Sequence, residues 1–162
     1  MLKNLFFRPI QAKDNAEIAK VIRQVLEEFG VNKPGTVYTD PTTDDLYSLF
    51  QTQKSHYIIA LHDHKIIGGC GIFPTKGLPE NCSELVKLYV DKDYRSFGIG
   101  KQLMLSCIEF AVKEGYSSLY LETLPELRNA IGLYNSLGFQ KLNAPLGDSG
   151  HFACDLWMLK KL

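Results

Sequence analysis

Hydrophobic and polar positions follow two rhythms along this chain, and the rhythms separate expected strands from expected helices. Short apolar runs, or alternation at every second residue, favour a strand, whereas apolar residues three and four apart favour a helix. Strands are therefore expected at residues 5–10, 56–61, 65–73, 82–90, 117–123, 139–142 and 152–162, and helices at 18–29, 44–53, 98–114 and 126–137.

The order of these elements predicts the fold class. A hairpin-rich first half is followed by a strand–helix–strand second half, which favours a mixed sheet with helices on both faces. The sequence contains no internal repeat, low-complexity segment or linker. We therefore expect one α/β domain over residues 1–162.

Composition and charge narrow the class of partner. Hydrophobic residues make up 45% of the 162 residues and charged ones 22%, as in ordinary globular domains. The net charge of zero provides no general field for nucleic acid or for an anionic membrane surface. No apolar run approaches the roughly 20 residues that cross a bilayer, and the N-terminus lacks the features of a signal peptide. We therefore expect neither a nucleic-acid partner nor a membrane.

The cysteines and histidines indicate no metal site. Four cysteines are widely spaced and form no CxxC pair: Cys70, Cys82, Cys107 and Cys154. This spacing predicts buried reduced thiols rather than a zinc site or a disulfide framework, and it favours a cytoplasmic location. His62 and His64 lie at an expected hairpin tip without a third ligand, so we expect no metal.

The stretch "YRSFGIGKQL", which begins at Tyr94, places two cations where a helix is expected to start. A helix N-terminus carries a partial positive charge, so Arg95 and Lys101 are unfavourable there unless an anion lies nearby. Gly98 and Gly100 allow a backbone to approach a ligand closely, and free N–H groups at a helix start bind anions. The stretch therefore predicts a diphosphate cradle.

Two common phosphate-binding motifs do not fit this stretch. No Gly-Lys-Ser/Thr sequence follows, which excludes a P-loop, and Leu103 stands where the third glycine of the dinucleotide fingerprint belongs. The remaining Arg-x-x-Gly-x-Gly pattern is short, and a basic surface turn is the alternative interpretation.

Three segments together resemble the GNAT superfamily of acyl-CoA-dependent N-acetyltransferases. They are "ELVKLYVDKDYRSFGIGKQLM", "LYLET" and "NAIGLYNSLGF", within a core of about residues 82–140. Arg95 to Gly100 stands at the family's Q/R-x-x-G-x-G/A loop, and "LYNSLGF" at its Tyr-x-x-x-Gly-Phe segment. At position 96 this chain has serine, where many members of the family have glycine. Because the family uses the backbone N–H groups of this loop, we expect the change to be tolerated.

The resemblance implies where acetyl-CoA binds. It implies a mixed, mostly antiparallel sheet of about seven strands, in which the strands at 82–90 and 118–122 splay apart to admit the coenzyme. The pantetheine arm is then held by backbone groups of Leu88, Tyr89 and Val90. The diphosphate is held at Arg95, Ser96, Phe97, Gly98, Ile99, Gly100 and Lys101. Asn129 is expected to contact the coenzyme, with helix capping or solvation as the alternative.

Transfer from a thioester to an amine needs a base, and Glu84 is the candidate. Alternation places Glu84 on one strand face with Val86, Leu88 and Val90, where lost hydration would raise its pKa. Some GNAT members carry a catalytic glutamate at the matching place. The alternatives are an exposed or lysine-paired Glu84, and a water chain as the base.

The departing thiolate needs a proton donor, and Tyr134 is the candidate. A phenol, with a pKa of about 10, stays protonated at neutral pH and can donate to a thiolate whose own pKa is about 8.5. The family match supports this role, and packing in the core is the alternative. Polarisation of the carbonyl oxygen is assigned to a main-chain N–H near Val90.

The acceptor is less defined by the sequence. By resemblance, it is selected by residues 30–42, 43–53 and 143–151, and His151 could reach it. These parts of the chain carry aromatic and acidic residues that suit an ammonium group: Tyr38, Tyr47, Glu27, Glu28 and Asp148. We expect acetyl transfer to a small-molecule amine or amino acid. A peptide or protein amine and a non-catalytic acyl-CoA sensor are the alternatives, and a homodimer is left open.

Overall fold

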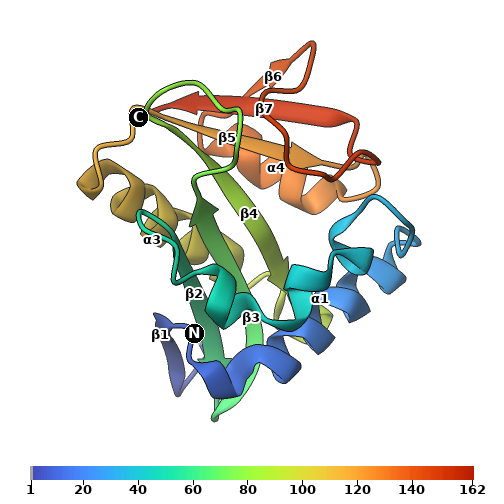
Figure 1. Ribbon diagram of the computed structural model, residues 1–162. Helices are drawn as coiled ribbons and strands as arrows, with labels where there is room; N and C mark the ends of the chain where they lie inside the picture. Colours follow the sequence, from blue (N-terminus) through green and yellow to red (C-terminus); the bar gives the residue numbers. More distant parts are fainter. Residues whose placement is uncertain (1) are drawn as a thin grey trace.

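Seven strands form one open sheet in the computed structural model, which describes residues 2–162 (Figure 1). In spatial order they are β1 (Leu5–Pro9), β2 (His56–His62), β3 (Lys65–Phe73), β4 (Cys82–Val90), β5 (Ser118–Thr123), β7 (Leu156–Lys161) and β6 (Gln140–Leu142). Only β4 and β5 are parallel neighbours, and every other neighbouring pair is antiparallel. This arrangement confirms the α/β class and the mixed sheet.

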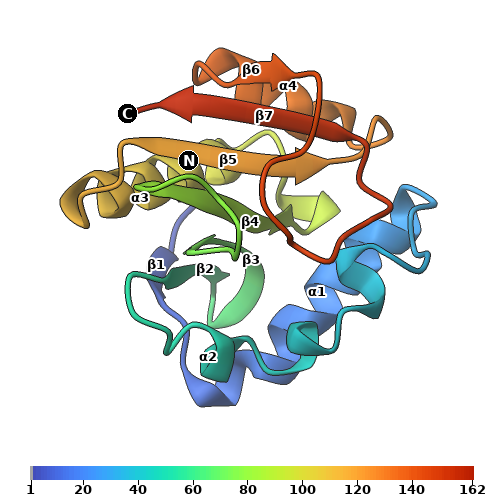
Figure 2. The ribbon, with the colours of Figure 1, turned by 45° about the horizontal axis from the view of Figure 1, so that its top comes forward.

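Helices cover both faces of the sheet, as expected (Figure 2). One layer holds α1 (Asn15–Glu28) and the single-turn α2 (Leu46–Leu49), and the other holds α3 (Ile99–Lys113) and α4 (Arg128–Ser136). The apolar stripe of α1 packs with β2 residues such as Ile59, while the stripe of α3 packs with β3 residues such as Cys70. The two cores therefore lie on opposite sides of the central strands.

The expected order of strands and helices is confirmed, and one helix is shorter than expected. The sequence predicts a helix over 44–53, but α2 contains only Leu46–Leu49. After it, Gln51 and Thr52 donate to the carbonyls three residues earlier, which is the tighter turn that ends a helix. The last strand also begins later than expected, at Leu156.

The expected hairpin is also confirmed, and three of the four cysteines are buried as expected. Asp63 and His64 both have positive φ values, 48° and 69°, and join β2 to β3 in the tight turn that suits a hairpin. All four cysteines are free thiols, and Cys154 is the one that is only partly buried. Within residues 2–162, each helix is too short or too polar to cross a membrane.

The sheet opens between its two parallel strands. β4 and β5 pair through three residue pairs only, of which Glu84 and Tyr120 are the last. Beyond that point the strands diverge (Figure 1), so the edge of β4 that faces β5 is unpaired from Leu85 onward. The predicted splay is therefore present, and Glu84 lies at its apex.

A bulge in β4 overturns part of the predicted alternation. Gly69 of β3 pairs with Tyr89 and Gly71 pairs with Val86, so β4 holds an extra residue between them. Lys87 takes the left-handed conformation there, with φ of 52°. The prediction that Glu84, Val86, Leu88 and Val90 share one face is wrong, because Leu88 and Val90 pack in the α3 layer and Val86 in the α1 layer.

Candidate active site

The turn from β4 into α3 is built to leave its amides free. Ser96 and Gly98 both have positive φ values, 69° and 76°, which turn successive N–H groups outward. Throughout residues 2–162, no oxygen accepts a hydrogen bond from the amides of 96–101. A glycine would take the Ser96 conformation without strain.

Arg95 does not point freely out of this turn. Its guanidinium forms two hydrogen bonds with the Glu28 carboxylate at the end of α1, at 2.7 and 2.9 Å. Its Nε donates to the Val90 carbonyl at 3.1 Å, and the group lies over the Phe29 ring. Arg95 therefore ties the turn to α1, whereas Lys101 is exposed.

A cavity of about 420 Å³ runs from this turn to the opening between β4 and β5. Most of the residues predicted to hold the coenzyme line it: Leu88, Tyr89, Val90, Arg95, Ser96, Gly98, Ile99, Gly100, Lys101 and Asn129. Phe97 is not in the lining, and 52% of it is exposed. The cavity therefore joins the expected coenzyme residues to the candidate catalytic pair.

Glu84 is buried at the apex of the opening. Only 3% of the residue is exposed, and its Oε2 accepts a hydrogen bond from Thr75 Oγ1 at 2.5 Å. Burial raises the pKa of Glu84 to about 7, and the charge of Glu122 adds to the rise, while Thr75, His151 and Lys87 oppose it. The alternative of an exposed Glu84 is therefore excluded, and the group can exchange a proton near neutral pH.

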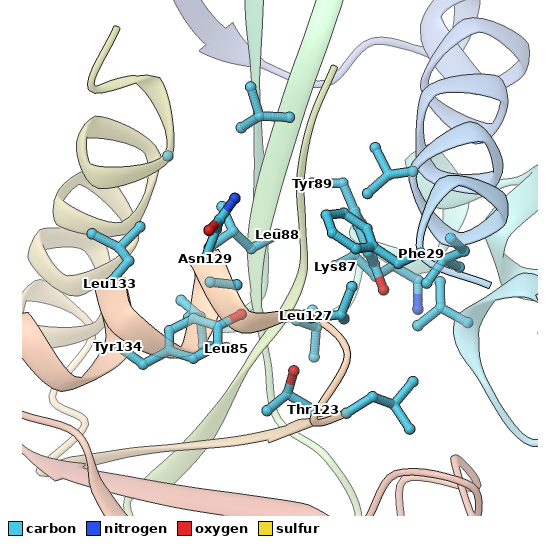
Figure 3. A pocket seen from close by; sticks show the side chains of 18 of the residues that line it. Phe29, Leu85, Lys87, Leu88, Tyr89, Thr123, Leu127, Asn129, Leu133 and Tyr134 are labelled. Carbon is cyan, nitrogen blue, oxygen red and sulfur yellow. The ribbon is translucent and has the colours of Figure 1, made fainter. Parts of the chain in front are cut away.

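Tyr134 approaches the same cavity from α4. It is 7% exposed, packs edge-on against Phe139, and points its hydroxyl toward the middle of the cavity (Figure 3). Burial raises its pKa well above the ordinary value, so the phenol stays protonated. Leu133 and Asn129 come from the same helix (Figure 3).

Two charged residues of the site, Glu122 and Lys87, were missed by sequence reasoning. Glu122, at the end of β5, accepts hydrogen bonds from Tyr120 at 2.7 Å and from Ser149. Lys87 is buried by the bulge, and its Nζ lies 3.7 Å from Asp40 Oδ2. Alternation places position 87 on the strand face opposite Glu84, and only the pairing with β3 reveals the bulge.

Two loops that are far apart in the sequence cover the cavity on the side opposite the turn and form its roof. His151 Nε2 lies 2.7 Å from Asp40 Oδ2, and the Ala153 amide donates to the Gly35 carbonyl at 3.0 Å. Figures 1 and 2 show the loop before β7 reaching toward the loop that follows α1. Both loops contribute to the cavity lining, the first through Thr36 and Val37 and the second through His151 and Cys154.

The aromatic and acidic residues expected to attract the acceptor lie elsewhere. Tyr38, Tyr47, Glu27, Glu28 and Asp148 are absent from the cavity lining. The Tyr38 hydroxyl is instead bonded to Glu27, and Glu28 to Arg95. The carboxylates that face the cavity are those of Glu84 and Glu122.

The side chain of Tyr57 contacts and stabilises the bulge in β4. The residue is fully buried, and its hydroxyl donates to the Lys87 carbonyl at 3.0 Å. Its ring occupies the space beside Gly69 and Gly71, where an added Cβ would lie 2.6 Å from ring atoms. The glycines of β3 therefore make room for the ring that fixes β4.

Comparison with known proteins identifies this arrangement. The model of the acetyltransferase (GNAT) family matches residues 22–139, which is most of the chain. The chain belongs to the GNAT family. Like other N-acetyltransferases, this GNAT protein is an enzyme that moves an acetyl group from acetyl-CoA to an amine.

Relatives by sequence are named as N-acetyltransferases. The chain is 36% identical to the uncharacterized N-acetyltransferase YjgM of Escherichia coli, over 96% of this chain and 93% of that protein. It is 33% identical to human N-acetyltransferase 8, over 70% of this chain and 53% of that protein. The match to the bacterial protein covers nearly all of both chains.

Solved structures share the fold at low sequence identity. A GNAT acetyltransferase from Staphylococcus aureus superposes with a TM-score of 0.83 and 20% identity, over 97% of this chain and 98% of that one. The PaiA N-acetyltransferase of Thermoplasma acidophilum, solved with coenzyme A, gives 0.75 and 19% over 98% and 99%. These likenesses confirm the GNAT fold.

Proposed function

We propose that this enzyme binds acetyl-CoA in the opening between β4 and β5 and acetylates the primary amine of a small molecule. The unpaired edge of β4 offers backbone groups of Leu88, Tyr89 and Val90 to the pantetheine arm, as an added strand would use them. The free amides of 96–101 suit a diphosphate at the start of α3. The solved structure of PaiA contains coenzyme A, which supports a coenzyme site in this fold.

The coenzyme-binding roles are divided between backbone and side chains. Ser96, Phe97, Gly98, Ile99, Gly100 and Lys101 contribute amides to the diphosphate. Arg95 keeps the turn in place through Glu28, and Asn129 lies in the cavity lining where it can contact the coenzyme. The assignment of Phe97 therefore depends on its backbone alone, since its side chain faces away.

One observation carries the proposed chemistry: the opening in the sheet brings Glu84 and Tyr134 to one cavity from opposite layers. A thioester between β4 and β5 would have Glu84 on the α1 side and Tyr134 on the α4 side. Glu84 takes a proton from the acceptor ammonium, and the amine nitrogen attacks the thioester carbon. The C–S bond then breaks as Tyr134 donates its proton to the departing sulfur, and the second proton that the nitrogen loses as the amide forms returns Tyr134 to its neutral form.

The small size of the acceptor is supported by the roof of the cavity. The contacts between His151 and Asp40 and between Ala153 and Gly35 join two loops across the acceptor side. A peptide segment would have to separate these contacts, whereas a small molecule fits beneath them. These loop contacts therefore favour a small amine over a protein.

Replacing Tyr134 with Phe tests the catalytic assignment. Among residues 2–162, no hydrogen bond contributes to the raised pKa of the Tyr134 hydroxyl, so its loss leaves no protein group unpaired. We expect kcat to fall by about 100-fold, while the Kd for acetyl-CoA and the free energy of unfolding stay close to the wild type. Calorimetry and steady-state kinetics measure these quantities, and unchanged turnover would rule out the donor role.

A further inference from the structure

The side chain of Lys87 has an unusual environment for a lysine. The bulge in β4 turns it into the cavity, and only 4% of the side chain is exposed. It lies on the α1 side with Phe29 (Figure 3). Lysine is rarely buried unless it is paired, because its ammonium group loses water on burial. The position therefore calls for a partner that compensates for this loss.

The protein supplies one ion-pair partner for this ammonium group, the carboxylate of Asp40. The Asp40 Oδ2 atom lies 3.7 Å from Lys87 Nζ, which is beyond ordinary hydrogen-bond range. Asp40 already accepts hydrogen bonds from the Thr42 amide and hydroxyl and lies 2.7 Å from His151 Nε2. Among residues 2–162, this long ion pair is the one contact of Lys87 Nζ with an acidic oxygen, and no oxygen lies within hydrogen-bond distance of it. Three N–H donors therefore remain for a ligand.

Opposite charges line the same cavity. Glu84 and Glu122 are the carboxylates on its wall. Lys87 and His151 are its basic side chains away from the turn into α3, where Arg95 and Lys101 lie. Glu84 and Lys87 are near enough that each charge affects the pKa of the other. A ligand that carries an ammonium and a carboxylate side by side would pair with both kinds of group.

From this arrangement we infer that the acceptor is a free amino acid, whose carboxylate is bound by the Lys87 ammonium while its amine faces Glu84. The inference rests on the proposed function and narrows its acceptor. A single buried ammonium matches the single charge of a carboxylate. An amine without a carboxylate, or the N-terminus of a peptide, would leave Lys87 buried without a hydrogen bond, and a site of this kind discriminates strongly against such analogues.

The wild-type enzyme provides the first test, because it requires no variant to fold. Standard L-amino acids, their α-carboxamides and the corresponding dipeptides are compared by thiol release from acetyl-CoA. For the best amino acid we expect kcat/KM to exceed that of its carboxamide and dipeptide by about 10- to 100-fold. Equal turnover of the three would overturn the inference and leave the proposed function intact.

A binding experiment tests the preference for a free amino acid even without turnover. The same compounds are titrated by calorimetry into the protein saturated with coenzyme A. Tighter binding of an amino acid than of its carboxamide supports the inference, and no such preference overturns it. Failure of all amines to release thiol would instead count against the proposed function, so the two failures are distinguishable.

Two variants test whether Lys87 causes the preference for a free amino acid. Lys87→Met keeps the length of the side chain and removes its charge, and the exposed Lys141→Met on β6 is the matched control. Lys87→Met should raise KM for the amino acid by about 10- to 100-fold and leave KM for acetyl-CoA and for the carboxamide unchanged. An equal loss with acid and carboxamide would show that Lys87 is structural.

Discussion

At the scale of single residues, Glu84 combines burial with a place at the reacting centre. Burial raises its pKa to about 7, so the carboxylate form that can accept a proton dominates above that pH. We expect kcat/KM to rise with pH through about 7 as Glu84 loses its proton. Deprotonation of the acceptor amine should give a second, separate rise. Glu84→Gln should lower kcat by about 10²- to 10⁴-fold and abolish the rise near 7. A pH–rate profile that keeps this rise in the variant would contradict the assignment.

The same burial predicts a cost in stability. The folded protein holds the Glu84 proton up to about pH 7, whereas the ordinary pKa is 4.5. Between these values the folded state binds more protons, so this group lowers the free energy of unfolding as the pH rises. The full loss is about 3 kcal/mol, from a pKa difference of about 2.5.

Glu84→Gln should therefore be a more stable protein at alkaline pH. The amide can still accept the hydrogen bond from Thr75 but has no charge to bury. We expect the free energy of unfolding, measured in urea, to exceed that of the wild type by up to about 3 kcal/mol at pH 8 and to be nearly equal to it at pH 5. A difference that is equal at the two pH values would show that Glu84 does not titrate in this range.

At the scale of elements, the bulge in β4 depends on the Tyr57 hydroxyl and can be tested through it. Tyr57→Phe leaves the Lys87 carbonyl without its partner, which should cost about 1–3 kcal/mol of stability. It should also lower kcat, because β4 carries Glu84 and the pantetheine edge. Denaturant unfolding and steady-state kinetics measure both effects.

A matched control exists for this variant. Tyr116 also donates a hydrogen bond to a backbone carbonyl, that of Lys54, at the same distance of 3.0 Å and outside the cavity lining. Tyr116→Phe should lose comparable stability and keep its kinetics. If both variants lose activity alike, Tyr57 has no special part in positioning β4.

The turn between β4 and α3 offers a second test at this scale. If Arg95 acts by tying the turn to α1, then Arg95→Ala and Glu28→Ala should weaken acetyl-CoA binding to a similar degree. We expect an increase in Kd of about tenfold for each, since such a pair contributes about 1–1.5 kcal/mol. Calorimetry would contradict this account if Arg95→Ala weakened binding and Glu28→Ala did not.

At the scale of the whole molecule, the parts predicted from sequence are those that local patterns determine. Apolar periodicity identifies every strand and the long helices, and the glycines near residue 98 mark the turn into α3. Glu84 and Tyr134 are found as candidates because they lie in recognisable segments of the chain. Their meeting at one cavity follows once the strand order is known.

The features that sequence patterns do not predict depend on contacts between segments that are far apart in the sequence. His151 and Asp40 are 111 positions apart and meet only when the last loop folds over the cavity. The bulge at Lys87 requires the glycines of β3 and the ring of Tyr57, none of which marks β4 itself. The acceptor side of the site is therefore the part that sequence patterns describe least.

The most direct test of the account is thiol release from acetyl-CoA at pH 8, with a panel of amino acids, polyamines, aminosugars and short peptides and a control without acceptor. We predict release that depends on an acceptor amine, an acetylated product detected by mass spectrometry, and a rate that falls at least about 100-fold in Glu84→Gln. Acetyl-CoA that binds but releases no thiol with any acceptor, or release that is equal in Glu84→Gln, would contradict the proposed site.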